Sequence, residues 1–291
     1  MAGRKVGIVG SGYVGVSTGK FMSELGHDVL YYDISRERLE QLSKEGQKTA
    51  SSLSELVKGS EFILICVPTP VTRGKMDLSI LKSSAEGIGS YLKKGQTIVI
   101  KSTVMPTMTE EAVLPLLRKK SGLKIGEFGL ATNPEFITQR KMTQPEETER
   151  TFQNIGRTIV GCNDEFSRKM MAELYRNYGG NIINTSIKVS EMVKCAANCA
   201  LASRISYFNE IKKICDKLGI DAGEVASICA MDDRIGKYGS REPGKAFAGA
   251  CLPKDLEAFV GFAYEKGCDA VLLKAIKDVN DWMRENHGTR E

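Results

Sequence analysis

The sequence predicts an α/β fold, in which a doubly wound parallel sheet is followed by an all-α domain built around a long helix. Up to residue 185, short apolar segments alternate with amphipathic ones, as in a parallel sheet covered by helices on both faces. From Ser186 onward the pattern is that of helices and one long loop. We therefore expect two domains, residues 1–185 and residues 186–291.

The first domain begins with a strand at 4–9, a glycine-rich turn, a helix at 13–25 and a strand at 28–33. This order is one β-α-β unit. Further strands are predicted at 61–67, 97–101 and 128–132, with helices at 35–45, 78–93 and 108–120. Weaker strands near 157–161 and 182–185, around a helix at 164–177, are expected to close the sheet.

The second domain is predicted to begin with one helix at 187–218, whose apolar face is rich in Ala, Met and Cys. Shorter helices follow near 221–230, 254–266 and 269–286, with a loop from Gly236 to Ala250. Apolar residues surround more of the long helix than one small domain would cover. We therefore expect a homodimer formed through this half.

Composition excludes several classes of protein. The chain has 291 residues, of which 42% are hydrophobic, and a net charge of +5. This mild excess suits an anionic ligand but is far from the basic surface of a nucleic-acid-binding protein. No run approaches the roughly 18 apolar residues of a membrane span, and the N-terminus lacks a secretory pattern. We expect a cytoplasmic protein without nucleic-acid or membrane partners.

Histidines and cysteines narrow the chemistry further. Neither histidine, His27 or His287, is an obvious catalytic group, and the sequence has no Tyr-x-x-x-Lys pair. Proton transfer in a dehydrogenase would therefore use lysine, cysteine or carboxylates. The eight cysteines show no C-x-x-C spacing. Cys195 and Cys199 lie one helical turn apart without a nearby histidine, so we expect no metal site and no disulfide framework.

A glycine loop follows the first strand and precedes a helix: Gly10-Ser11-Gly12-Tyr13-Val14-Gly15. Gly10 permits a tight turn, Gly12 lets the backbone approach a pyrophosphate, and Gly15 lets helix and sheet pack closely. The helix N-terminus supplies N–H donors to phosphates. These features predict a Rossmann-like domain that binds a dinucleotide.

The second strand ends at Asp33, 18 residues after Gly15. A carboxylate at this place accepts the ribose hydroxyls and repels a 2′-phosphate, which favours NAD over NADP. Arg36 and Arg38 lie close enough to weaken that preference.

Polar residues end three predicted strands. The segments are Cys66-Val67-Pro68-Thr69-Pro70, Lys101-Ser102-Thr103-Val104 and Thr132-Asn133-Pro134-Glu135-Phe136. Turn chemistry explains each segment alone. Their joint position is equally consistent with one ligand crevice at the carboxyl ends of the strands.

Lys194 and Asn198 lie one turn apart on the long helix and point the same way. A lysine among apolar residues keeps its charge only with a partner or a cavity, and a solvated lysine is the alternative. If the pair faces Cys251 and Asp255, it forms an oxyanion clamp.

Cys251 lies in the segment Gly249-Ala250-Cys251-Leu252-Pro253-Lys254-Asp255-Leu256. The small residues before it leave access, and Lys254 and Asp255 begin a helix, whose N-terminus favours an ionised thiol. A core cysteine is the alternative. A nicotinamide-binding fold with a reactive thiol suggests an oxidation through a covalent thioester.

Together these segments resemble the UDP-glucose/GDP-mannose dehydrogenase family. The matching segments span nearly the whole chain in the family's order: Gly10 to Gly15, Cys66 to Pro70, Ser102 to Val104, Asn133 to Phe136, Lys194 to Asn198, Ser206 to Glu210, Asp233 to Gly236 and Gly249 to Asp255. The resemblance implies a four-electron oxidation of a nucleotide sugar's C6 alcohol to a carboxylate with two NAD.

The resemblance also implies residue roles. Cys251 would attack the aldehyde, and Lys194 and Asn198 would stabilise the oxyanion. Thr103, Glu135 and Asp255 would position or activate water. NAD would be contacted by the glycine loop, Asp33, Arg38, Pro68, Thr69, Thr103 and Lys254. The substrate would be contacted by Glu135, Phe136, Lys194, Asn198, Arg234 and Gly249.

The sequence departs from the family pattern at four places. Gln139 stands where a glutamate is usual, Ala248-Gly249 where Gly-Gly is usual, and Met105 to Met108 replace a Pro/Gly-rich turn. The sequence ends at Glu291, just after the helix that leads into a third domain in the family. Two alternatives stay open: a β-hydroxyacid-type dehydrogenase using Lys194 without a covalent step, and a catalytically silent NAD-binding subunit that needs a partner chain.

Overall fold

The structure is a computed structural model, which describes residues 3–137, 152, 155–240 and 243–290. The chain forms two compact units. The first takes in Met1–Thr69 and Asp77–Lys194, and the second takes in Pro70–Met76 and Cys195–Glu291. The division at Lys194 falls inside a helix, so our domain boundary at residue 185 stays a prediction about how the chain is organised.

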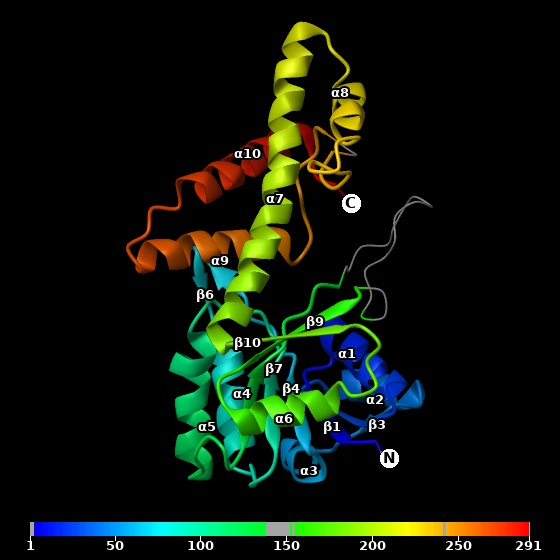
Figure 1. The fold of residues 1–291 in the computed structure, drawn as a ribbon, viewed down its shortest axis with the longest axis vertical. Helices are drawn as coiled ribbons and strands as arrows, with labels where there is room; N and C mark the ends of the chain where they lie inside the picture. The colour runs from blue at the N-terminus through cyan, green and yellow to red at the C-terminus, as the bar shows by residue number, and fades with distance from the viewer. Residues whose placement is uncertain (1–2, 138–151, 153–154, 241–242, 291) are drawn as a thin grey trace. The chain divides into compact units, whose positions relative to one another are not determined.

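The first unit is built on one eight-stranded sheet, with the strand order β10-β9-β8-β7-β4-β1-β2-β3 (Figure 1). The strands are β1 (Lys5–Val9), β2 (Asp28–Tyr32), β3 (Lys48–Thr49), β4 (Phe62–Ile65), β7 (Thr97–Ile100), β8 (Gly129–Thr132), β9 (Arg157–Cys162) and β10 (Asn181–Thr185). From β3 to β8 neighbouring strands are parallel. This is the order of a doubly wound dinucleotide-binding sheet, whose direction of winding reverses between β1 and β4.

The predicted sheet is confirmed with one difference of direction. β9 pairs with β8 in the antiparallel sense, and β10 pairs with β9 in the parallel sense. The alternation of apolar segments does not show this reversal, because a buried strand has the same pattern in either direction.

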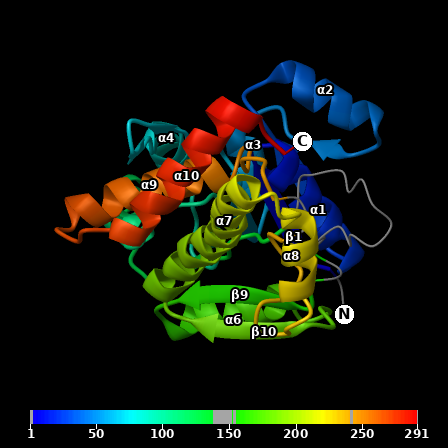
Figure 2. The ribbon, with the colours of Figure 1, turned by 90° about the horizontal axis from the view of Figure 1, so that it is seen from above.

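Helices cover both faces of the sheet. α1 (Tyr13–Glu24) and α6 (Glu165–Leu174) share a core with Val6 and Ile8 of β1, and Figure 2 shows α6 alongside β9 and β10. Gly7 points to the opposite face, where an added Cβ would meet Leu56 of α3 (Leu53–Gly59) at 2.6 Å. On this face α3 contacts α4 (Ser79–Gly89), which contacts α5 (Leu114–Ser121).

Several short elements of the first unit are not predicted by the periodicity of the sequence. β3 and α3 replace a stretch that we left unassigned, and α3 is capped by the Ser52 side chain, which accepts from the Glu55 amide. The helix predicted at 108–120 is a π-helical turn, Thr109–Val113, followed by α5. α2 (Arg36–Lys44) lies within the predicted range.

The second unit is helical, as predicted. It contains α8 (Ala222–Cys229), α9 (Leu252–Glu265), α10 (Val271–His287) and the part of α7 (Ile187–Leu218) that follows Lys194. Its core joins α7, α9 and α10 through Ala202, Ile205, Leu256, Val260 and Ile276, with Phe247 from the preceding loop. No helix in the described part of the chain is long and apolar enough to cross a membrane.

A small hairpin from the first half of the sequence completes this unit. β5 (Val71–Thr72) and β6 (Lys75–Met76) pack on α9. The backbone amide of Gly74 donates to the Glu257 carboxylate at 2.9 Å. This hairpin cannot be predicted from the sequence pattern, because strands of two residues carry no periodicity.

Candidate active site

The glycine loop has the geometry of a phosphate-binding turn. Gly10 has a φ of +92°, and an added Cβ would lie 2.9 Å from the Cys66 carbonyl oxygen. A Cβ on Gly15 would lie 1.9 Å from the Gly10 carbonyl oxygen, so both positions require glycine. These contacts fit the roles that the sequence assigned to the two residues.

The N-terminus of α1 fits a pyrophosphate. Gly12 is the N-cap, no side chain caps the helix, and the first turn has no acidic residue. A Cβ on Gly12 would have nothing within 4 Å, so the backbone faces open space. A helix N-terminus with this access favours a bound anion. The expected binding of a cofactor's phosphates by Gly12, Tyr13 and Val14 fits this geometry and stays a prediction.

Asp33 connects the end of β2 to the glycine loop. Its Oδ2 accepts from the Ser11 amide at 2.7 Å and from the Ser11 hydroxyl at 2.9 Å, and its Oδ1 accepts from the Ser35 amide at 3.0 Å. Burial alone would raise the pKa of Asp33, but the hydrogen bonds from Ser35 and Ser11 outweigh it and lower the pKa. The carboxylate is thus held ionised at the strand end where ribose hydroxyls bind in this fold.

Arg38 touches the same loop. Its Nε donates to the Ser11 carbonyl oxygen at 3.0 Å, and one terminal nitrogen donates to Gln41 at 2.9 Å. Arg38 and Asp33 therefore both bond Ser11, and the expected contact of Arg38 with the cofactor stays a prediction.

Two of the predicted strand ends meet in the first unit. The buried Thr69 hydroxyl donates to the Thr103 carbonyl oxygen at 2.8 Å, while Pro68 is exposed. Ser102 donates to the Val67 carbonyl oxygen at 2.6 Å. These bonds tie the segments after β4 and β7 together, as expected for neighbouring strands.

Lys194 is buried in an ion pair with Glu135. Its Nζ donates to the Glu135 carbonyl oxygen at 2.6 Å and to the carboxylate at 3.0 Å, and both residues are at least nine-tenths buried. The ammonium also lies 5.2 Å from the centre of the Phe136 ring. The other carboxylate oxygen of Glu135 accepts from the Ile137 amide. The alternative of a solvated lysine is therefore wrong.

Lys101 lies close to this pair, and the sequence analysis did not assign it to the site. It is 2% exposed, and its Nζ donates to Asn133 Oδ1 at 2.8 Å. Asn133 also accepts from the buried Tyr175 hydroxyl. The available signal was a lysine placed directly after the apolar strand Thr97–Ile100, without an opposite charge beside it in the sequence.

The reactive cysteine of the hypothesis begins α9. Cys251 is the N-cap of this helix and is half-buried, and its carbonyl oxygen accepts from the Asp255 amide at 2.9 Å. The thiol is therefore at the positive end of a helix dipole, where a thiolate is stabilised. Because Cys251 is only half-buried and caps a helix, it is not a cysteine of the hydrophobic core.

Asp255, in the first turn of α9, is bonded to two polar side chains. Its carboxylate is buried and accepts from the Asn198 amide nitrogen at 2.6 Å and from Lys254 Nζ at 2.7 Å. Because Cys251 and Asp255 are one helical turn apart, they lie on the same face of α9. Asn198 therefore bonds Asp255, while the expected clamp of Lys194 and Asn198 facing Cys251 stays a prediction.

The remaining predicted substrate contacts lie in loops. Arg234 is exposed and pairs with Asp232 at 2.6 Å. Gly249 has a φ of +83° and open space around it, which keeps the approach to Cys251 free of a side chain. Gln139 lies outside the described residues.

Other candidate groups have structural roles or lie apart from these residues. His27 accepts from the Arg4 amide through Nδ1, and its Nε2 bonds the Leu174 carbonyl oxygen at 2.7 Å. Cys195 and Cys199 are buried, and no metal-binding group of His, Cys, Asp or Glu occurs among the described residues.

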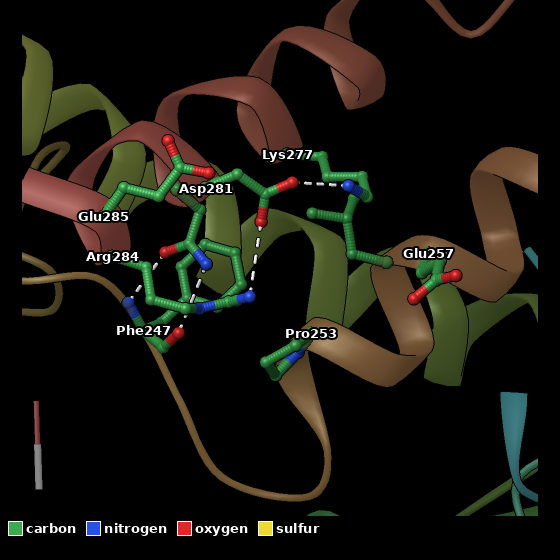
Figure 3. A pocket seen from close by; sticks show the side chains of 9 residues that line it. Phe247, Pro253, Glu257, Lys277, Asp281, Arg284 and Glu285 are labelled. Atoms are coloured by element: carbon green, nitrogen blue, oxygen red, sulfur yellow. Dashed lines mark hydrogen bonds and ion pairs between the residues drawn. The ribbon is translucent and has the colours of Figure 1, made fainter. Parts of the chain in front are cut away.

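A cavity of about 340 Å³ opens between α9 and α10 (Figure 3). It is lined by Phe247, Pro253, Leu256, Glu257, Lys277, Asn280, Asp281, Arg284 and Glu285. Its α9 residues, Pro253, Leu256 and Glu257, are spaced three and four apart. They occupy the helix face opposite Cys251 and Asp255. The Cys251 thiol therefore does not face this cavity.

Comparison with known proteins agrees with these features. Residues 4–59 and 43–179 match the NAD binding domain of the UDP-glucose/GDP-mannose dehydrogenase family, and residues 188–282 match its central domain. UDP-glucose 6-dehydrogenase TuaD of Bacillus subtilis is 29% identical over 97% of this chain, and GDP-mannose 6-dehydrogenase of Azotobacter vinelandii is 30% identical over 99%. This chain spans 64% and 72% of those two relatives.

Solved structures give the same picture. A UDP-glucose dehydrogenase from the archaeon Pyrobaculum islandicum superposes with a TM-score of 0.85 at 28% identity. The match covers 97% of this chain and 69% of that one.

Proposed function

Because the chain belongs to the UDP-glucose/GDP-mannose dehydrogenase family, we propose that it oxidises the C6 alcohol of a nucleotide sugar to the carboxylate. NAD, when bound, accepts one hydride in each of two successive steps. The observation that carries the proposal is the group at the start of α9: Cys251 at the helix N-terminus, with Asp255, Asn198 and Lys254 bonded together one turn on.

The first step converts the alcohol to an aldehyde by loss of a hydride and a proton. Lys194, whose ammonium is paired with Glu135, would bind the sugar oxygen as it gains negative charge. The buried position of this pair strengthens the interaction, because little water screens it.

The second step uses the thiol. Cys251 Sγ adds to the aldehyde carbon, the proton passes to the oxygen, and the product is a thiohemiacetal that can still lose hydride. Loss of that hydride to NAD and of the hydroxyl proton to solvent gives a thioester. The Asn198 amide, fixed by Asp255, is a donor for the oxygen during addition.

Hydrolysis of the thioester returns the thiol. Water adds to the thioester carbon, Cys251 leaves, and the carboxylate is released. Asp255 and Glu135 are the carboxylates that would accept the proton of water, and Thr103 would help to position the water molecule. Per sugar, two NAD and one water are consumed and two NADH are formed.

We further propose that the chain forms a homodimer through its helical unit. The C-terminal part of α7 and the segment around α8 expose large apolar side chains: Tyr207, Ile214, Leu218, Ile228 and Met231. A group of exposed apolar residues of this kind is typical of an interface between proteins.

The experiment is a screen of UDP- and GDP-sugars that reads NADH formed per sugar consumed. Two NADH per sugar are expected. One NADH per molecule of a small hydroxy acid, and none with nucleotide sugars, would favour the β-hydroxyacid alternative. NAD binding without NADH formation from any substrate would favour the silent subunit.

A further inference from the structure

Lys101 is a buried cation that the proposed reaction does not use. It follows β7, and its side chain is almost entirely shielded from solvent. Among the described residues no carboxylate lies within ion-pairing distance of its ammonium. Its partners are one amide oxygen, on Asn133, and the Phe152 ring, whose centre lies 4.9 Å away. Burying a charged group with only one hydrogen bond and one ring contact lowers the stability of the fold. Stability therefore does not explain a lysine at this position, and we look for a role in the site.

Asn133 links this ammonium to the turn that carries Glu135. Its Oδ1 accepts from Lys101 and from the Tyr175 hydroxyl. Its Nδ2 donates to the Thr158 hydroxyl at 2.9 Å and to the Ile159 carbonyl oxygen at 2.7 Å. All four hydrogen-bonding positions of the amide are thus used. The backbone of the Asn133-Pro134-Glu135 turn is fixed two residues before the carboxylate that holds Lys194.

The charged and titratable groups that face Lys101 come from three other elements. Cys66 follows β4, Glu135 follows β8, and Lys194 is on α7. The Lys101 charge attracts Glu135 and repels Lys194. The charge of Lys101 therefore acts on both members of the Lys194–Glu135 ion pair.

We propose that Lys101 is a positioning residue for Glu135: its ammonium fixes the Asn133-Pro134-Glu135 turn through Asn133, and its charge attracts the Glu135 side chain that holds Lys194. The inference rests on the proposed function for its catalytic consequence. The electrostatic link among the three residues can be measured without a substrate.

The link has a pH signature. Burial lowers the pKa of Lys101 to about 8, with the charge of Lys194 acting in the same direction and Cys66 and Glu135 opposing it. Burial raises the pKa of the Cys66 thiol to about 12 and keeps that of Tyr175 above its usual value, so both stay neutral there. Loss of the Lys101 proton near this pH removes the positive charge that attracts the Glu135 side chain.

The test compares Lys101→Met with Lys119→Met, which removes an exposed lysine on α5. In the wild type, kcat is expected to fall as the pH rises through about 8. In Lys101→Met we expect kcat at pH 7 to be at least about tenfold lower and this fall to be absent, while the Kd for NAD changes less than about twofold. The Lys119→Met control should match the wild type in all three.

The thermal stability of Lys101→Met distinguishes a positioning role of Lys101 from a role in stabilising the fold. The folded pKa of Lys101 lies below its unfolded value, so the wild type bears the full cost of the buried charge below about pH 8 and regains stability as the pH rises towards 10.5. Lys101→Met should therefore have a Tm equal to or above that of the wild type at pH 7. That advantage should shrink at higher pH.

Lysine NMR gives a readout that does not depend on activity. With ¹³C-labelled lysine, we expect the Lys101 signal to titrate near pH 8 and the Lys194 signal to shift in the same transition. In Glu135→Gln the shift of Lys194 should be reduced. If no nucleotide sugar yields NADH, the proposed function fails, whereas this coupling is still measured.

Three results would overturn the inference: a Lys101→Met enzyme with the kcat and pH profile of the wild type, a Lys194 signal that ignores the titration of Lys101, or additive losses when Lys101→Met is combined with Glu135→Gln. If Lys101→Met does not fold, Lys101→Gln takes its place, since it keeps a donor for Asn133 without the charge. An alkaline fall in kcat that persists in Lys101→Gln would then reject the proposal.

Discussion

Asp33 shows how one side chain can serve both the fold and the cofactor. Its carboxylate fixes the first serine of the glycine loop through two hydrogen bonds, at the end of the strand where ribose hydroxyls bind. Arg38 donates to the same serine from α2. We therefore predict that the choice between NAD and NADP depends on the same carboxylate that fixes the loop.

Asp33→Asn keeps the size of the side chain and removes its charge. The repulsion of a 2′-phosphate should then fall, so we expect the preference for NADH over NADPH to drop by at least about tenfold, or roughly 1.4 kcal/mol. The measurement is the Kd of each nucleotide by fluorescence titration. Asp28→Asn, at the exposed start of the same strand, is the matched control. Equal preferences in Asp33→Asn and the wild type would contradict the assignment of Asp33.

At the scale of elements, the hairpin of β5 and β6, which comes from the first half of the sequence, packs against α9. Gly74 of the hairpin donates to Glu257, and an added Cβ on Gly261 would lie 2.0 Å from the Gly74 carbonyl oxygen. The helix held in this way begins at Cys251. The hairpin follows Thr69 directly in the chain, so a segment from the first half of the sequence packs on the helix that Cys251 caps.

Two glycine substitutions test this contact. In Gly261→Ala the new methyl group meets backbone, whereas in Gly59→Ala, at the end of α3, it meets Leu30 at an ordinary 3.8 Å. Alanine favours a helix by up to about 1 kcal/mol, so Gly59→Ala should be neutral or stabilising. Gly261→Ala should lower the unfolding free energy by about 1–3 kcal/mol through overpacking. Chemical denaturation measures both, and equal changes would show that the hairpin does not pack against Gly261.

At the scale of the whole molecule, the helical unit exposes several large apolar side chains. Met231 is 81% exposed and Leu218 is 66% exposed. The chain also spans only 64–72% of the two curated relatives described above. We propose that a second copy of the chain covers these side chains.

The mass in solution tests this proposal. Sedimentation equilibrium should give twice the 31.9 kDa of one chain. The variant Ile228→Glu with Met231→Glu should shift the mass towards one chain, because a buried charge in the interface has no partner. Ile34→Glu, which changes an exposed apolar residue of the first unit, should leave the dimer intact. A monomeric wild type would refute the proposal.

Much of this organisation could be predicted from the sequence, and the exceptions share a cause. The long helix has the predicted bounds because 32 residues of helical periodicity leave little freedom. The glycine loop and Asp33 were predictable because their chemistry is local. The hairpin on α9 and the antiparallel β9 were missed, since both depend on which distant segment pairs with them. Lys101 was missed for the same reason: its role comes from Asn133 and Glu135, which follow another strand.

The central claim is that Cys251 carries the sugar as a thioester, and rapid quenching of turnover in acid followed by peptide mass spectrometry tests it most directly. We expect the peptide containing Cys251 to gain the mass of the oxidised sugar nucleotide, in the wild type and in Cys268→Ser, which lacks an exposed cysteine. Cys251→Ser should form no thioester adduct and should lose the second NADH. An unmodified Cys251 peptide during steady turnover, together with two NADH per sugar in Cys251→Ser, would contradict the account.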